Sequence, residues 1–387
     1  MKKLLIVVLV LSLVLAFAAC GGGGETAAPP AEGEQQGGGG TEETGDGLDW
    51  SNIKIGVTLE ATTSDGGWGT SFAESVKKFI ADHDMKDDQV VIIENIFGGT
   101  EDVENIMGEL VDDGCDLIIA HSGGYTGQLA PIAAKYPDVY FAGFECQVSS
   151  PNAMMYSFSD YQSEFMCGYL SALMSEGDQL GFVATMPTTT ICRMVNAYAL
   201  GAKYANPNAT VQVMFTSSWY DPLVEKEAAA TLISKGITVM GYSGSSSAVA
   251  TACTEAGGGV YCTGNYMDMY EYGPKVVLTS HLINWNATLD DVVGKVIDGT
   301  WDGQTVIYTM AQGAAKPSAP NADIVPAEII AQFEEVNALM TAGEIDVFAG
   351  PLSDNQGNVL AAAGEKLEGT DLLSVTYLVD NVIGNLP

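Results

Sequence analysis

The chain has 387 residues, 47% hydrophobic and 17% charged, and its 15 lysines and arginines against 49 acidic residues give a formal net charge of −34 at pH 7. This length and apolar content can bury one large or two medium cores, which excludes a wholly disordered protein. Such a negative charge repels phosphate backbones and anionic lipids, so we expect no nucleic-acid partner and no membrane attachment through a basic patch.

Residues 1–19 have the pattern of an export signal. Two lysines precede an apolar run that is too short for a membrane span of about 20 residues, and small residues lead to Cys20. The segment resembles a bacterial lipoprotein signal, with Phe17 where leucine is usual, which implies that Cys20 is acylated after cleavage. The alternative is an ordinary secretory signal followed by an incidental cysteine.

Residues 20–50 read as a lipid-anchored linker. From residue 21 to 47 the chain is almost entirely Gly, Glu, Thr, Ala, Pro and Gln, which cannot offset the entropy of folding. About 27 flexible residues reach on the order of 25–30 Å. We therefore expect the protein on the extracytoplasmic face of the cell membrane, held there by its lipid.

The remaining cysteines suggest buried free thiols more than a disulfide framework, because most have apolar or small neighbours. The sequence has three histidines and neither a CxxC motif nor a Cys/His spacing typical of zinc, so we expect no metal site and no cofactor. These six cysteines are Cys115, Cys146, Cys167, Cys192, Cys253 and Cys262.

From residue 52 onward, short apolar runs typical of buried parallel strands alternate with amphipathic helical stretches. The rhythm restarts after Met154, which predicts an α/β fold of two doubly wound lobes with a central cleft at the carboxyl ends of their strands. The predicted strands are 54–59, 89–94, 117–120, 140–144, 180–185, 211–216, 239–242 and 259–263. The predicted helices are 71–82, 100–112, 161–175, 190–204, 222–234 and 247–255.

The end of the chain is expected to cross between the lobes, about three times in all. Residues 276–279 and the helix 289–298 look like a return to the first lobe, and 326–342 like part of the second. The predicted lobes are therefore 51–155 with 264–305, and 156–263 with 306–387.

Four motifs in fixed order resemble the basic membrane protein (BMP) family of nucleoside-binding lipoproteins, over residues 53–387. The resemblance implies a type I periplasmic binding fold, a monomer that captures a small molecule for an ABC permease, and no catalysis. The motifs are Ser64-Asp65-Gly66-Gly67-Trp68, Ala134-Lys135-Tyr136-Pro137-Asp138, Gly201-Ala202-Lys203-Tyr204-Ala205-Asn206-Pro207 and Val277-Leu278-Thr279-Ser280.

The sequence looks closer to one branch of that family, and it departs from the nucleoside binders at two positions. Those proteins hold ribose with an aspartate and a lysine where this chain has Tyr266 and Ile283. The resemblance therefore implies a purine, with a nucleobase favoured over a nucleoside. The branch motifs are Ser218-Trp219-Tyr220-Asp221-Pro222, Gly264 with Asp268-Met269, Tyr272-Gly273-Pro274, Asn284-Trp285 and Gly299-Thr300-Trp301.

In the first lobe, Trp68 follows a strand, a turn and Gly67, so its indole can project into the cleft and stack on a purine, or can pack between the lobes. Asp65 can accept a hydrogen bond from an exocyclic amine or cap the following helix. Ser122 and Gly124 end another strand with free backbone N–H groups. Tyr125 is a second aromatic wall or a packing residue.

In the second lobe, Arg193 is the sole arginine and shares a helical face with Asn196, which suits either a cleft or a structural ion pair. For Asp221 we favour the N-cap of the helix at 222, with Trp219 facing the ligand. Asp268 and Met269 are expected where the chain recrosses between the lobes, next to hinge and ligand.

Two other functions are weighed against capture of a purine base. In the first, a protein of the same fold binds a nucleoside or a sugar. In the second, the chain is an exported nucleoside-processing enzyme. An enzyme needs a carboxylate cluster with a metal or a nucleophile motif, and the sequence shows no GxSxG, Cys/His pair or Walker loop. We therefore expect binding without chemistry.

Overall fold

The computed structural model describes residues 47–148 and 150–387. The expected export signal, Cys20 and the linker up to residue 46 lie outside the described residues. Within the described ranges, no helix combines the length and the apolar character that crossing a membrane requires.

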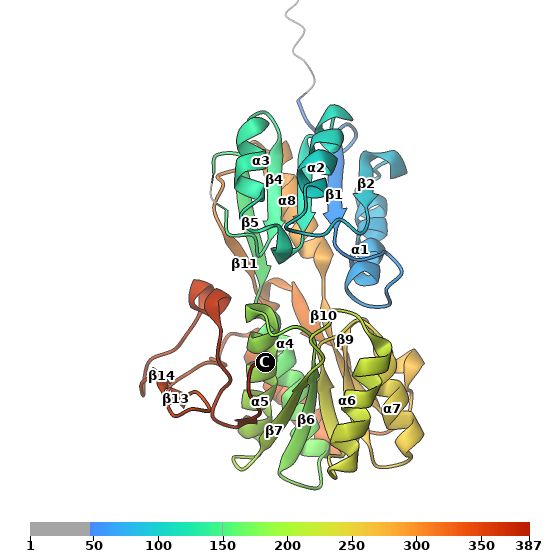
Figure 1. Ribbon diagram of the computed structural model, residues 1–387, viewed down its shortest axis with the longest axis vertical. Coiled ribbons are helices and arrows are strands. Elements are labelled where there is room, and N and C mark those ends of the chain that lie inside the picture. Colours follow the sequence, from blue (N-terminus) through green and yellow to red (C-terminus); the bar gives the residue numbers. More distant parts are fainter. Residues whose placement is uncertain (1–46, 149) are drawn as a thin grey trace, which may run out of the picture. The chain divides into compact units, whose positions relative to one another are not determined.

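The first lobe is built on a parallel sheet of six strands in the order β11-β5-β4-β3-β1-β2 (Figure 1). Its helices cover both faces, with one apolar cluster between α1, α8 and the sheet and another on the side of α2 and α3. The strands are β1 (Ile55–Leu59), β2 (Val90–Ile93), β3 (Leu117–His121), β4 (Tyr140–Phe144), β5 (Ala153–Phe158) and β11 (Val306–Tyr308). The helices are α1 (Trp68–Asp82), α2 (Asp102–Asp112), α3 (Leu129–Lys135) and α8 (Trp285–Ile297).

The second lobe repeats this plan with seven strands in the order β12-β10-β9-β8-β6-β7-β15, all parallel except β12. One apolar cluster lies with α4, α5 and α9, and the other with α6 and α7. The strands are β6 (Gln179–Ala184), β7 (Thr210–Phe215), β8 (Val239–Tyr242), β9 (Tyr261–Tyr266), β10 (Val277–Ile283), β12 (Ala315–Pro317) and β15 (Val382–Ile383). The helices are α4 (Asp160–Met174), α5 (Thr189–Ala205), α6 (Pro222–Ser234), α7 (Ala248–Ala256) and α9 (Ala327–Thr341).

Short elements complete the described chain. A two-stranded antiparallel hairpin lies near the C-terminus, and its strands are β13 (Leu352–Ser353) and β14 (Val359–Ala361). Five 3₁₀ helices follow strands or turns, namely η1 (Asp87–Gln89), η2 (Gly123–Tyr125), η3 (Met269–Tyr272), η4 (Met310–Gln312) and η5 (Gly369–Ser374).

The two doubly wound lobes and most of their elements are confirmed. β1 and β3 are buried along their whole length, as strands covered on both faces must be. The apolar stripe predicted for the first helix is the buried face of α1, which includes Phe72, Val76 and Phe79. The six cysteines of the described part are free and buried, as expected.

Two strand assignments were wrong. The run at 276–279 was expected in the first lobe, but β10 lies in the second sheet between β9 and β12. Residues 306–308 were expected in the second lobe, but β11 pairs with β5 of the first sheet. A short apolar run fits either sheet, because only pairing with a distant strand decides between them. The chain passes between the sheets after β5, after β10 and after β11.

Candidate functional site

Segments that follow strands of the two sheets contact one another. The backbone N–H of Trp68, in the segment after β1, donates to Ser245 Oγ after β8 at 3.2 Å. Glu145, after β4, accepts a hydrogen bond from Arg193 Nη2 of α5 at 2.7 Å. Ligands of open α/β sheets bind at this edge of the strands, so the junction of the lobes is the candidate site.

Backbone strain is concentrated at these strand ends. Four non-glycine residues with positive φ end a strand or follow one, namely Asn95 (60°), Glu145 (49°), Ser217 (56°) and Tyr266 (62°). Non-glycine residues with positive φ are uncommon and collect at functional sites, where the surrounding structure holds them in place. The strain marks the same edge as the contacts between the lobes.

Trp68 lies in an aromatic cluster that joins the two lobes. Its indole stacks on His121 with centroids 4.7 Å apart, and Tyr266 of the second lobe meets it edge to face at 5.2 Å. Phe144 and Trp285 also contact it edge to face. Trp68 and Tyr266 are half-buried residues, and the cluster packs the two lobes against each other.

Asp65 is a helix cap in this structure. Its carboxylate accepts hydrogen bonds from the backbone N–H groups of Gly67, Gly69 and Thr70 at 2.9–3.0 Å, and one from the Thr70 hydroxyl. These bonds satisfy backbone N–H groups in the first turn of α1, because no carbonyl of an earlier helical turn is available to accept from them. Of its two predicted roles, the structure shows the cap.

Gly67 permits a close approach between the lobes. A Cβ built at this position would lie 2.5 Å from the Cα of Ser245. Only a residue without a side chain fits there unless the Ser245 backbone moves.

Ser122 and Gly124 are positioned by a carboxylate that the sequence analysis missed. Glu60, directly after β1, accepts hydrogen bonds from the Ser122 hydroxyl and from the Gly98 backbone N–H. Ser122 Oγ in turn accepts from Gly124 N at 2.9 Å. Glu60 therefore organises the loops after β1, β2 and β3 at the candidate site.

Tyr125 is not an aromatic wall of the cleft. Its side chain is fully buried in the first-lobe core, and its hydroxyl donates to the Ile96 carbonyl at 2.6 Å. The 3₁₀ turn of η2 directs the ring inward, where an apolar body with one hydrogen-bonded hydroxyl is stable.

Arg193 forms the structural ion pair that was one of its two predicted roles. The guanidinium is buried, and it donates to Asp160 Oδ1 through Nε at 3.1 Å and to Glu145 through Nη2. Glu145 belongs to the first lobe and Arg193 to the second, so the pair joins the two. Thr190 and Ser157 also donate to the Glu145 carboxylate.

Burial and the ion pair shift the pKa values of the two carboxyl groups in opposite directions. Burial by itself raises the pKa of Glu145, but Arg193 and the hydrogen bonds from Thr190 and Ser157 hold it below the ordinary value. For Asp160 burial prevails over the attraction of Arg193, so its pKa is raised. The contact with Arg193 across the junction therefore favours the ionised form of Glu145.

Asn196 does not face a ligand. It is buried, its Oδ1 accepts from Val379 N at 2.9 Å and its Nδ2 donates to the Tyr377 carbonyl at 2.9 Å. Although it shares a helical face with Arg193, this face is covered by the C-terminal segment of the chain.

The loop after β7 carries the predicted cap and an exposed indole. Asp221 Oδ1 accepts from Leu223 N and Val224 N at 3.2 Å, which confirms it as the N-cap of α6. Trp219 is 56% exposed. In this structure it points to solvent, so its expected ligand contact stays a prediction.

Asp268 and Met269 were misplaced. They lie between β9 and β10, which are neighbours in the second sheet, so the chain does not cross between lobes there. Asp268 is exposed and caps η3 through Tyr270 N, and Met269 is buried in the core beside α7.

A cavity of about 400 Å³ opens beside the Gly67–Ser245 contact. Residues 64–66 of the first lobe line it, together with the serine-rich turn 245–247, Tyr220, Lys226 and Tyr272 of the second. This volume is in the range of small-molecule sites. Its hydroxyl groups and two exposed tyrosine rings suit a polar ligand.

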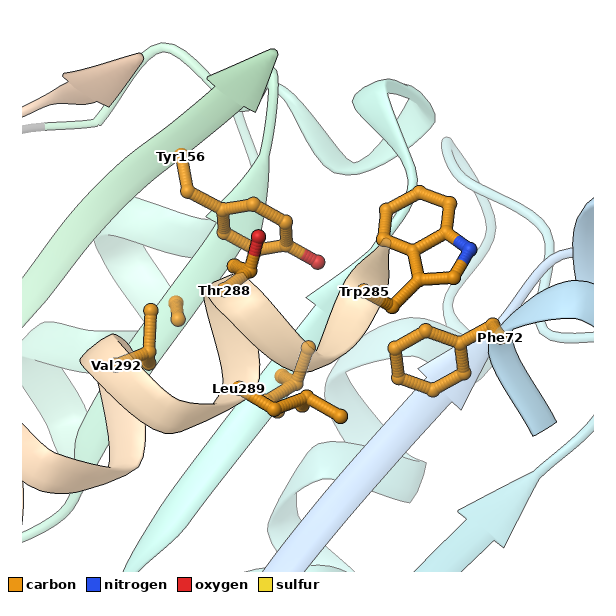
Figure 2. Close-up of a pocket in the computed structure, with 8 residues that line it drawn as sticks. Phe72, Tyr156, Trp285, Thr288, Leu289 and Val292 are labelled. Carbon is orange, nitrogen blue, oxygen red and sulfur yellow. The ribbon is translucent and has the colours of Figure 1, made fainter. Parts of the chain in front are cut away.

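A second, much smaller cavity lies inside the first-lobe core. Figure 2 shows Phe72, Tyr156, Trp285 and Thr288 around it, and its volume is about 10 Å³. That is about the size of one water molecule, so this void belongs to the packing of α8 on the sheet and not to a ligand site.

In the described part of the chain, no group of three or more His, Cys, Asp or Glu side chains is placed to hold an ion. The site residues that sequence reasoning missed are Glu60, His121 and Glu145. Each ends a predicted strand or directly follows one, so polar residues at strand ends were the signal that could have identified them.

Comparison with known proteins identifies relatives over most of the chain. A family model for Bmp, described as ABC transporter substrate-binding protein PnrA-like, matches residues 52–347. A purine-binding protein of Brucella abortus is 28% identical over 337 residues, which is 87% of this chain and 94% of that protein. A putative ABC transporter glucose-binding protein of Haloferax volcanii is 26% identical over 66% of this chain and 65% of that protein.

Among solved structures, an ABC transporter solute-binding protein from Aeropyrum pernix has a TM-score of 0.65 at 18% identity, covering 78% of this chain and 94% of that one. At this identity the likeness shows the fold alone. The architecture is that of a type I periplasmic binding protein.

Proposed function

This chain belongs to the Bmp family of ABC transporter substrate-binding proteins, and from that premise we propose that it captures a purine, with a nucleobase favoured over a nucleoside. It delivers the purine unchanged to an ABC permease and performs no chemistry. The proposal draws on a purine-binding relative that aligns over nearly its whole length.

One observation carries the choice of a flat aromatic ligand. The half-buried rings of Trp68 and Tyr266 come from different lobes and lie 5.2 Å apart, centroid to centroid. When the lobes separate, each presents an aromatic face to the gap, and stacking of a base on such a ring contributes about 1–3 kcal/mol. The carboxylate of Glu60 at the same edge is an acceptor of the kind that base amines and ring N–H groups require.

The preference for a base agrees with the surroundings of Tyr266 and Ile283, the two positions at which this chain differs from the nucleoside binders of the family. Tyr266 offers a phenol where the nucleoside binders of the family have an aspartate, and Ile283 is buried in an apolar cluster of the first lobe. Neither side chain supplies a charge to ribose.

We further propose that residues 1–19 are removed, that Cys20 is acylated, and that the protein works as a monomer on the extracytoplasmic face of the cell membrane. The support is the sequence pattern at the N-terminus and the family's role beside a membrane permease.

Calorimetric titration tests the ligand class. We expect heat of binding from at least one of adenine, guanine and hypoxanthine, weaker binding of adenosine and guanosine, and no release of free base from a nucleoside. Binding of none of the five compounds contradicts the proposal, and turnover of a nucleoside would establish an enzyme instead.

A sugar or nucleoside is the second candidate, and a specific feature favours it. The cavity of about 400 Å³ is lined by serine hydroxyls and by the rings of Tyr220 and Tyr272, a lining suited to a polyhydroxylated ring. The named glucose-binding relative points the same way. Glucose and ribose therefore belong in the same titration series.

A further inference from the structure

The last part of the chain, residues 348–387, lies beyond the 52–347 match to the family model. It contains the β13–β14 hairpin, η5 and β15, and it is red in Figure 1. This segment contacts both lobes.

The end of this segment is fastened to the second lobe. β15 extends the sheet as a parallel neighbour of β7, and the Asn196 side chain holds the backbone of Tyr377 and Val379. The Asn381 side chain donates to the Ala199 carbonyl at 2.8 Å. Residues 377–383 are therefore a fixed part of that lobe.

At η5 the same segment reaches both lobes. Leu372 is 1% exposed and packs in the second-lobe cluster with α4 and α5. The next residue, Leu373, packs against the first-lobe cluster that includes Phe141 and Met155. Two successive leucines thus join the two cores.

A polar contact lies at the same place. The Leu372 carbonyl accepts a hydrogen bond from Arg193 Nη1 at 3.2 Å, and Nη2 of the same guanidinium holds Glu145 of the first lobe. If the lobes separate, Leu373 loses its apolar contact and Glu145 leaves a buried arginine without one of its two carboxylates.

We propose that residues 369–374 form a strap that stabilises the contact between the lobes and so sets how readily the protein opens. A ligand held between two lobes escapes through the open state, so it leaves faster when that state is more populated. Its apparent affinity falls as well, because a smaller fraction of the protein is closed. The strap acts on the lobe equilibrium itself, with or without ligand, which takes it beyond the proposed function.

Leu373→Ser tests the strap through the distance between the lobes. Spin labels on cysteines introduced at Glu74 of α1 and Glu227 of α6, both exposed, report that distance, and the six native cysteines of the described part are buried. Without ligand, we expect the variant to populate longer distances than the wild type. With a bound purine, we expect release about three- to tenfold faster.

Val359→Ser is the matched control, since Val359 lies in the same segment but is 72% exposed. It should leave both measurements at the wild-type values. If Leu373→Ser does not fold, Leu373→Ala makes the same comparison with a smaller loss. A distance distribution for the Leu373 variant equal to that of the wild type overturns the strap, whereas a wild type that binds no purine overturns only the proposed function.

Discussion

Trp68 contacts aromatic rings of both lobes, stacking on His121 in its own lobe and meeting Tyr266 of the other edge to face. Of the two roles that the sequence allowed, the structure shows packing between the lobes, and stacking on a ligand stays a prediction. For other residues with two predicted roles, the structure shows the structural role. Asp65 and Asp221 cap helices, and Arg193 forms an ion pair.

Trp68→Ala should weaken purine binding by at least about 1 kcal/mol, or about fivefold in Kd, because it removes one stacking face. Titration calorimetry of the folded variant measures the change. Trp301→Ala is the control, since that indole packs on Tyr140 at the amino end of β4, away from the site. Equal affinities for wild type and Trp68→Ala would remove the stacking proposal.

Among the elements, the loops after β1 and β8 decide how closely the lobes approach. They meet at Gly67 and Ser245, where the absence of a side chain on one loop leaves room for the other. The hydrogen bond from Trp68 N to Ser245 Oγ fixes the same contact. The start of α1 is thereby tied to both lobes.

Gly67→Ala should weaken ligand binding while each lobe stays folded, because the new methyl group overlaps Ser245 only when the lobes meet. Forcing an extra methyl group into a packed contact costs about 1–3 kcal/mol, so we expect a rise of about five- to 150-fold in Kd. Gly294→Ala in α8 has no atom within 4 Å of the added Cβ and should bind as the wild type does. An undiminished affinity of Gly67→Ala would show that the two loops do not meet in the bound state.

At the scale of the whole molecule, buried titratable groups tie stability to pH. His281 of β10 is fully buried, neither ring nitrogen has a hydrogen-bond partner in the described structure, and burial lowers its pKa from 6.5 to about 3. Burial also lowers the pKa of His121 in the first lobe. Each lobe therefore holds one uncharged histidine in its interior.

The sign of the effect follows from linkage. Below pH 6.5 the His281 imidazole binds a proton in the unfolded chain but stays neutral in the folded protein. The free energy of unfolding therefore falls as the pH falls from 6.5 toward 3. Between pH 7.5 and 5.5 one such histidine costs about 1.4 kcal/mol. Urea unfolding of the wild type and of His281→Leu at the two pH values measures it, and we expect the variant to lose about 1.4 kcal/mol less.

Glu164 acts in the opposite direction, since burial raises its pKa and its ionised form disfavours the folded state at neutral pH. It is present in both proteins, so the comparison isolates His281. The same loss of stability in wild type and His281→Leu would contradict a neutral buried imidazole.

The sequence by itself determined whatever depends on neighbouring residues. Apolar periodicity predicted the two α/β lobes and most helices, and local chemistry predicted the Asp221 cap that the structure confirms. Such features rest on contacts within a few residues, which the order of side chains contains.

Only the tertiary structure decided which distant segments pair. It placed β10 and β11 in the opposite sheets from those expected, turned Tyr125 into the core, and gave Asn196 to the C-terminal segment. It also joined Arg193 to Glu145, 48 residues earlier in the chain. The reason is physical, since a short apolar strand or a buried polar group has many acceptable partners, and the packing of the whole chain selects one.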